Sequence, residues 1–443
     1  MEEKRYPKVI VTCIDAWRGD VGANTLPNFF TSWNPNQLAV VYTKADLPET
    51  KLCNCFFQIA ENEVLHAAFH PGRKCGKIVY NETIKKNIVQ KEAEEVIEEH
   101  KRYDFFRKYR WSLFYIARDI LWGMGAWKND NFDCFLKKVD ADVIFFPIYP
   151  YTYMNKIQSY IAKKTGLRGV AYVADDNYSY KPEWYNPLFN LRRFFLRKSI
   201  REVMQYCDEL LVILPMLEKE YGKNFNIPIK VLTKGIDTDK SHFVESAKQF
   251  PLKMVYTGNL FIGRDKSIIK VIKAIEKINQ ENGRTTIQLD IYSHIHLSES
   301  LLKRLNIKGS SRFMGAVPTS EVEGIQNKAD IVLFVEGIDF MNKNKARLSF
   351  STKLTDYFRS GKCIFAVGKT NIAPIDYLLK NNAAVIANSS KSIYLQLQKI
   401  VARPELIDKY GQTAYNLGIR NHSDTDMKNV LYYSLKKTSK LDN

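Results

Sequence analysis

A hydroxyl-rich loop followed at once by a lysine is the feature of this sequence that most clearly suggests chemistry. The loop and the helix expected after it read SFSTKLTDYF, from Ser349 to Phe358. A helix that begins at Lys353 presents free backbone N–H groups and its positive dipole end beside Ser351 and Thr352, either of which could cap it. Because Lys353 adds a cation, the segment predicts a phosphate-binding site. An ordinary loop with a solvated lysine is the alternative that the pattern leaves open.

Two adjacent carboxylates, Asp175 and Asp176, are the second candidate. They follow the apolar run 169–173, which predicts an inner strand of a parallel sheet. The carboxyl ends of such strands face a ligand crevice, where a carboxylate could act as a base or orient a hydroxyl group. Adjacent residues at a strand end point to opposite sides, so at most one should have this role. An aspartate that only caps the next turn is the competing interpretation.

A glycine-containing loop after the first predicted strand, 8–14, is a third candidate. It holds Asp15, Arg18, Gly19 and Gly22. The G-x-G-x-x-G spacing of dinucleotide-binding loops is absent, so we expect a ligand-side loop without that fingerprint.

Apolar runs that alternate with helical segments predict two α/β domains in tandem. The strands expected in the first half are 8–14, 38–42, 142–147, 169–173, 208–213 and 230–232, and those in the second are 254–257, 287–292, 312–314, 331–335, 363–367 and 384–386. This alternation is typical of doubly wound parallel sheets. We therefore predict two Rossmann-like domains, 1–235 and 236–415, and a C-terminal helix, 416–443, that returns to the first domain.

Composition narrows the function classes. The chain has 443 residues, enough for two or three cores, and 66 Lys and Arg against 48 Asp and Glu, a net charge of +18. This charge predicts anionic partners: phosphorylated ligands, an anionic membrane surface or nucleic acid. Seven cysteines without paired metal spacing predict reduced thiols and a cytoplasmic location. No signal peptide or membrane-spanning run is expected.

Two segments, 101–127 and 188–206, mix aromatic and basic residues. They could be core helices with a solvated basic face. Alternatively, they could dock on an anionic membrane surface. In the second case the residues expected to carry salt-sensitive binding are Arg107, Lys108, Arg192, Arg193 and Arg197.

The stretch STKLTDYFRSGKCIFAVG resembles the nucleotide-sugar site of GT-B glycosyltransferases, especially the large retaining family four of bacterial polysaccharide biosynthesis. Lys353, Tyr357, Gly361 and Lys362 match that family's pattern, while Asp356 stands where it usually has Glu. Three further segments follow the family's order: KVLTKGID, MVYTGNLFIGRDKS and SRFMGAVPTSEVEGIQNKADIVLF. In the first of them, Lys234 replaces the usual Asn.

The resemblance implies a fold of two domains that face each other across a cleft, and a donor site in the second. The residues implied there are Gly258, Asn259, Arg264, Gly315, Val317, Ser351, Thr352, Lys353 and Asp356. Arg264 and Lys353 would stabilise the diphosphate leaving group without a metal ion, so we expect no cofactor beyond the nucleotide-sugar donor. We also expect both cations to be exposed, so that replacing either leaves the fold intact. The family's first Glu has no clear counterpart, although Glu336 lies nearby.

The resemblance also assigns the first half of the chain to the acceptor, with Asp175 and Asp176 as catalytic candidates and the loop after the first strand on the acceptor side. The implied function is a cytoplasmic, metal-independent hexosyltransferase, peripheral on the inner membrane face. It would transfer sugar to a lipid-linked or growing glycan in surface polysaccharide biosynthesis. The alternatives are a nucleotide-sugar epimerase of the same fold, a catalytically idle partner subunit, and a basic nucleic-acid-binding protein, whose reader motif is missing.

Overall fold

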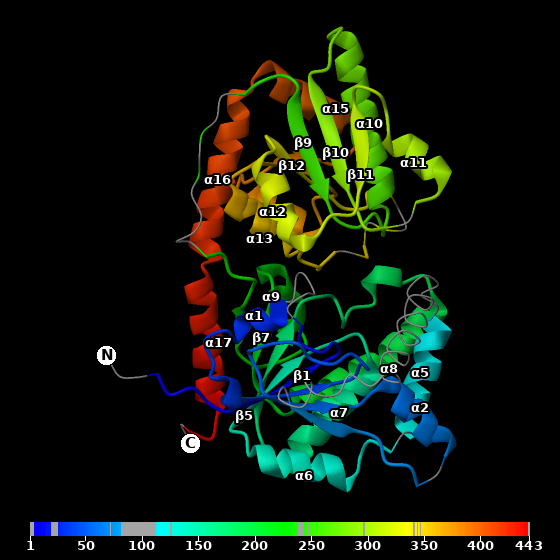
Figure 1. The fold of residues 1–443 in the computed structure, drawn as a ribbon, viewed down its shortest axis with the longest axis vertical. Helices are drawn as coiled ribbons and strands as arrows, with labels where there is room; N and C mark the ends of the chain where they lie inside the picture. The colour runs from blue at the N-terminus through cyan, green and yellow to red at the C-terminus, as the bar shows by residue number, and fades with distance from the viewer. Residues whose placement is uncertain are drawn as a thin grey trace. The chain divides into compact units, whose positions relative to one another are not determined.

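The computed structural model describes residues 4–18, 25–70, 72–80, 112–124, 126–237, 243, 245, 248–295, 297–339, 342, 344–345 and 347–441. The chain divides into two compact units (Figure 1). The first comprises Met1–Thr233 and Lys428–Asn443, and the second comprises Lys234–Met427. Each unit holds its own sheet with helices packed on it, so the predicted pair of doubly wound α/β domains is confirmed.

The first unit is built on an eight-stranded sheet with the order β4-β3-β2-β1-β5-β6-β7-β8. Neighbouring strands run parallel except β3 and β4, which are antiparallel. The strands are β1 (Val9–Cys13), β2 (Leu38–Tyr42), β3 (Cys55–Gln58), β4 (Lys77–Tyr80), β5 (Val143–Pro147), β6 (Gly169–Val173), β7 (Cys207–Val212) and β8 (Ile229–Val231). Among the described residues of this unit, the helices are α1 (Thr25–Phe29), α2 (Glu61–Phe69), α5 (Ser112–Met124), α6 (Asp130–Val139), α7 (Thr152–Thr165), α8 (Pro187–Met204) and α9 (Pro215–Gly222). The final helix, α17 (Asp424–Thr438), begins in the second unit and ends in the first.

The second unit has a six-stranded parallel sheet with the order β11-β10-β9-β12-β13-β14. Its strands are β9 (Leu252–Thr257), β10 (Ile287–Tyr292), β11 (Ser311–Gly315), β12 (Ile331–Val335), β13 (Cys363–Val367) and β14 (Val385–Ala387). Its helices are α10 (Arg264–Glu281), α11 (Glu299–Leu305), α12 (Thr319–Asn327), α13 (Lys353–Ser360), α14 (Ala373–Lys380), α15 (Ser390–Ala402) and α16 (Glu405–Asn421). The strand order reverses between β9 and β12, and ligands of doubly wound sheets bind at such a switch point.

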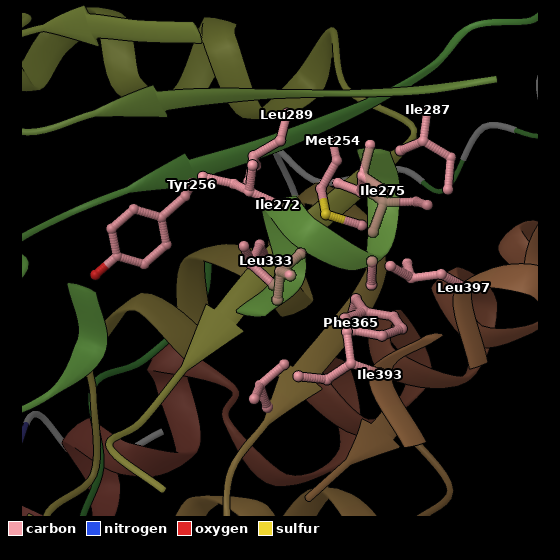
Figure 2. Close-up of a cluster of buried hydrophobic side chains, with 14 of the residues drawn as sticks. Met254, Tyr256, Ile272, Ile275, Ile287, Leu289, Leu333, Phe365, Ile393 and Leu397 are labelled. Atoms are coloured by element: carbon pink, nitrogen blue, oxygen red, sulfur yellow. The ribbon is translucent and has the colours of Figure 1, made fainter. Parts of the chain in front are cut away.

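An apolar core fixes the strands and helices of the second unit. Figure 2 shows side chains from the strands, such as Met254 and Leu333, packed against Ile275 of α10 and Leu397 of α15. Alternate residues of β9, β10, β12, β13 and β14 enter this cluster, as the two-residue period of a strand requires. The core therefore holds the carboxyl ends of β9 and β12 in place, and these ends carry the candidate site.

The two segments that connect the units pair with each other inside the second unit. The Ile236 amide donates a 2.6 Å hydrogen bond to the His422 carbonyl, and the Asp424 amide donates to the Ile236 carbonyl. A Cβ on Gly235 would overlap the backbone of Asp424, so this close approach requires glycine. Close packing against Asp424 therefore explains the glycine at position 235.

His422 is buried in this pairing and should make stability depend on pH. Its ring stacks on Phe350 and lies near Phe358, and Tyr377 Oη is 3.0 Å from Nε2. Burial lowers the pKa of His422 to about 4. Because the unfolded chain binds a proton near pH 6.5 and the native state does not, stability falls as pH drops from about 6.5 to 4, by about 3 kcal/mol in total. Urea unfolding across this range measures the loss.

His422→Gln is the matched control, since its amide oxygen still accepts a hydrogen bond from Tyr377 but does not titrate. The difference in unfolding free energy between parent and variant should shrink by about 3 kcal/mol between pH 7 and pH 4. A difference that stays constant over this range would show that His422 is protonated in the native state.

Candidate functional site

The candidate site lies at the switch point of the second sheet. Gly258 directly follows β9, and Glu336 directly follows β12, the neighbouring strand. The loop after Gly258 leads to α10, which begins at Arg264, and α13 begins at Lys353. Three separate segments therefore bring polar residues to one edge of this sheet.

Arg264 is held by a buried carboxylate at this edge. Its guanidinium contacts both oxygens of Glu336 at 2.9–3.2 Å, and its Nη1 donates to Asn259 Oδ1 at 2.9 Å. Glu336 is only 2% exposed. Burial alone would lower the pKa of Arg264, but the Glu336 carboxylate raises it above the usual value. The expectation of an exposed cation is wrong here, because Arg264 belongs to a buried ion pair.

Lys353 is the second cation of the site and is also largely shielded from water. Its ammonium lies 5.0 Å from the centre of the Tyr256 ring. Burial, together with the nearby Arg264, lowers the pKa of Lys353 to about 8. Gly258 makes this position available, because a Cβ at residue 258 would collide with the Lys353 ammonium. The match of Gly258 to the family pattern thus has a steric cause.

Two departures from the family pattern contact each other. Lys234, which stands in place of Asn, forms a 2.7 Å ion pair with Asp356, which stands in place of Glu. Asp356 lies one turn into α13, on the same helix as Lys353. The shorter carboxylate is therefore held by a lysine that the crossover segment supplies.

The remaining candidates of the second unit lie at the same sheet edge or beside it. Gly315 ends β11 with φ +79°, a conformation that favours glycine, and its carbonyl accepts a hydrogen bond from Ser293 N. Val317 follows it and is half-buried. Thr352 occupies the N-cap of α13 but makes no side-chain capping hydrogen bond, while the Ser351 carbonyl accepts from Leu354 N. The expected hydroxyl cap by Thr352 is therefore not formed.

In the first unit the two adjacent aspartates differ sharply. Asp176 is buried, and its carboxylate accepts hydrogen bonds from the Ser179 amide at 2.9 Å and the Ser179 hydroxyl at 2.5 Å. Asp175 is exposed at the carboxyl end of β6. The structure gives Asp176 the role of holding the loop and presents Asp175 to solvent.

The loop after β1 is tied to the loop after β2. Asp15 pairs with Lys44, and Arg18 lies 3.5 Å from Asp46 and 3.7 Å from Glu49. Both candidate residues, Asp15 and Arg18, are therefore used in ion pairs that connect the two loops. Gly19 and Gly22 fall outside the described residues.

Three arginines of α8, Arg192, Arg193 and Arg197, face the protein interior. Arg192 lies over the Tyr115 ring at 4.1 Å and donates to the Pro150 carbonyl. Arg193 and Arg197 donate to the carbonyls of Asp176 and Tyr178, at 3.2 and 2.9 Å. The hypothesis that these three side chains bind an anionic surface is contradicted by their contacts, which hold the loops after β5 and β6. Arg107 and Lys108 lie outside the described residues.

Glu336 and Lys234 are the site residues whose roles the sequence did not reveal. Glu336 follows the predicted strand 331–335, so its place at a strand end was a usable signal. Its partner Arg264 is 72 residues away, and Lys234 and Asp356 are 122 residues apart. Pairings over such distances depend on the fold.

Comparison with known proteins supports the architecture. Neither the protein-family models nor the curated protein sequences give a match. Among solved structures, Anabaena HepE in complex with UDP-glucose has 8% identity and a TM-score of 0.59, covering 98% of this chain and all of that one. The sucrose-phosphate synthase of Thermosynechococcus elongatus has 11% identity and a TM-score of 0.57, with the same coverage. The trehalose-phosphate synthase of Burkholderia vietnamiensis has 7% identity and a TM-score of 0.58, covering 97% of this chain and all of that one. The chain therefore has the GT-B fold.

Proposed function

We propose that this protein is a glycosyltransferase that transfers a sugar from a nucleotide-diphosphate donor to a hydroxyl acceptor. The observation that carries the proposal is the placement of Arg264 and Lys353 at the switch point of the second sheet, beside the glycine that leaves room for the lysine ammonium. Doubly wound sheets bind nucleotides at this point.

The proposed chemistry follows from the charges. A nucleotide diphosphate gains negative charge as its bond to the sugar breaks, and fixed cations stabilise that charge. Glu336 neutralises Arg264, so the pair is close to neutral and Lys353 supplies the net positive charge. A diphosphate would restore a charged partner to Lys353 and favour its protonated form. No metal ion is needed in this scheme.

The ligands of three neighbouring structures support this assignment. HepE was solved with UDP-glucose and also with UDP and glucose, and a trehalose-6-phosphate synthase of E. coli was solved with UDP-2-fluoro glucose. For this chain we propose a hexose donor, a mechanism of the family-four type and an acceptor that is lipid-linked or a growing glycan of a surface polysaccharide. We also propose a peripheral position on the cytoplasmic face of a membrane.

A catalytically idle partner subunit is the second candidate. The observation in its favour is the engagement of Arg264 by both Glu336 and Asn259, which leaves fewer of its N–H groups for a ligand. Hydrolysis or transfer from any of a panel of nucleotide sugars separates the two candidates, because an idle subunit turns none of them over.

Lys353→Met tests the donor site. It should weaken UDP or GDP binding by roughly 1.5–3 kcal/mol, the range for a lost charge-assisted contact. It should also raise the stability of the unliganded protein at pH 7, by up to about 3 kcal/mol, because a lysine whose pKa falls from 10.5 to about 8 destabilises the native state below pH 8. Calorimetric titration and urea unfolding measure the two effects.

Lys273→Met, a change at an exposed lysine of α10, is the matched control and should alter neither quantity. In the parent, nucleotide affinity should decline as pH rises above about 8, because Lys353 loses its proton. Equal nucleotide affinity of Lys353→Met and the parent would show that the donor site lies elsewhere.

A further inference from the structure

An apolar surface on α8 is left exposed by the part of the chain that the structure describes, and it is not part of the proposed site. Among the described residues of this helix and the turn before it, six large apolar side chains are 42–60% exposed: Trp184, Tyr185, Leu188, Leu191, Phe194 and Phe195. Positions 188, 191, 194 and 195 fall on one face of a helix. We call these six side chains the α8 outer face.

The opposite side of α8 is apolar too and forms part of the core. Phe189, Leu196 and Ile200 are buried there. The sequence therefore shows no single apolar stripe, because the helix has two. Apolar side chains on two sides of a helix are normally both covered, and here those on one side are exposed.

The helix next to α8 also carries exposed apolar side chains. α5 packs against α8, as Figure 1 shows, and contributes the exposed side chains of Ile120 and Met124. Several large apolar side chains exposed on one helix face are typical of protein–protein or membrane interaction sites. No helix within the described ranges is long and apolar enough to cross a bilayer.

We infer that the α8 outer face docks on the surface of an anionic lipid membrane, with its apolar side chains inserted at the headgroup level. The stretch 184–201 contains no Asp or Glu, and the exposed Lys198 and Arg201 follow the apolar residues on the same helix. Trp and Tyr at one end and cations at the other suit a membrane interface. The inference rests on the proposed function only for its purpose, which is to bring the enzyme to a lipid-linked acceptor.

The charges favour lipid over a second copy of the chain. A twofold interface repeats one surface on both partners, so the facing stretch 184–201 of a second copy would offer Lys198 and Arg201 no carboxylate. An anionic headgroup layer instead neutralises both cations, each of which adds to the attraction. In this inference the apolar side chains, not Arg192, Arg193 and Arg197, contact the membrane, because these three arginines face the protein interior.

Flotation of the full chain with vesicles tests the inference. Vesicles of phosphatidylcholine with roughly a third phosphatidylglycerol should bind the parent, and pure phosphatidylcholine should bind it more weakly. Leu191→Ser with Phe194→Ser should lower the partition coefficient on anionic vesicles by about 10-fold or more. The matched control is Leu395→Ser with Tyr433→Ser. These two side chains are 48% and 58% exposed, as against 49% and 57% for Leu191 and Phe194. The control variant should bind the vesicles as the parent does.

Circular dichroism and the melting temperature check that each variant is folded. Lys198→Glu gives a second test, because it leaves every apolar side chain in place. Lys198→Glu should reduce binding to anionic vesicles several-fold. Parent-like binding by the Leu191/Phe194 variant, or no vesicle binding by the parent, overturns the inference. A parent dimer that the same variant makes monomeric, without vesicle binding, assigns the face to a second copy and also overturns it. The flotation assay contains no nucleotide sugar, and Lys353→Met should bind vesicles as the parent does. A failure of the membrane inference can therefore be told apart from a failure of the proposed function.

Discussion

Replacing Arg264 with alanine is expected to lower the free energy of unfolding by about 3–5 kcal/mol and to weaken nucleotide diphosphate binding in the same protein. The change leaves Glu336, which is 2% exposed, as a buried carboxylate without its guanidinium partner. The cost of such an uncompensated charge exceeds the net stabilisation that the intact pair provides. Urea unfolding measures the first effect, and calorimetric titration with UDP and GDP measures the second.

The double variant Arg264→Met/Glu336→Leu separates stability from binding. It removes both charges and retains apolar volume, so it should recover most of the lost stability. It should not recover nucleotide binding, because the guanidinium is still missing. If Arg264→Ala unfolds like the parent, the carboxylate has another adequate partner and the pair does not organise the site.

The parallel sheets could be predicted because their strands are continuous apolar runs. Residues 331–335 and 363–367, for example, match β12 and β13 at both ends, and all five residues of each strand are buried. The sequence did not reveal β3 and β4, which have four residues each. β4 lies at the sheet edge with two exposed residues and runs antiparallel to β3, so it lacks the pattern of an inner strand.

The candidate site could be predicted as a set of positions but not as a set of contacts. Gly258, Arg264 and Lys353 each stand in a recognisable local motif. The burial of Arg264 and its pairing with Glu336 depend on how β9 and β12 lie side by side, which no local pattern contains. For the same reason the sequence showed that α8 has mixed apolar faces, but it did not show that Arg192, Arg193 and Arg197 point inward.

Asp175→Asn is expected to lower turnover by about 100-fold or more while nucleotide binding stays unchanged. The exposed carboxylate at the end of β6 has the position from which a side chain of a parallel sheet reaches a ligand. A group that removes a proton from a hydroxyl acceptor, or orients that hydroxyl, contributes about this much to the rate. Turnover at saturating donor, together with a separate titration of UDP, measures the two quantities.

Asp176→Asn is the matched comparison, with the same chemical change one residue away. Asp176 accepts two hydrogen bonds from Ser179, and weakening these buried contacts should cost about 1–2 kcal/mol of stability. Turnover of the folded protein should change far less than in Asp175→Asn, because the Asp176 carboxylate is already used to hold the loop. Small and equal effects of both changes on turnover would exclude this motif from the mechanism. The acceptor chemistry would then be sought in the loop after β1, where Asp15 is exposed and pairs with Lys44.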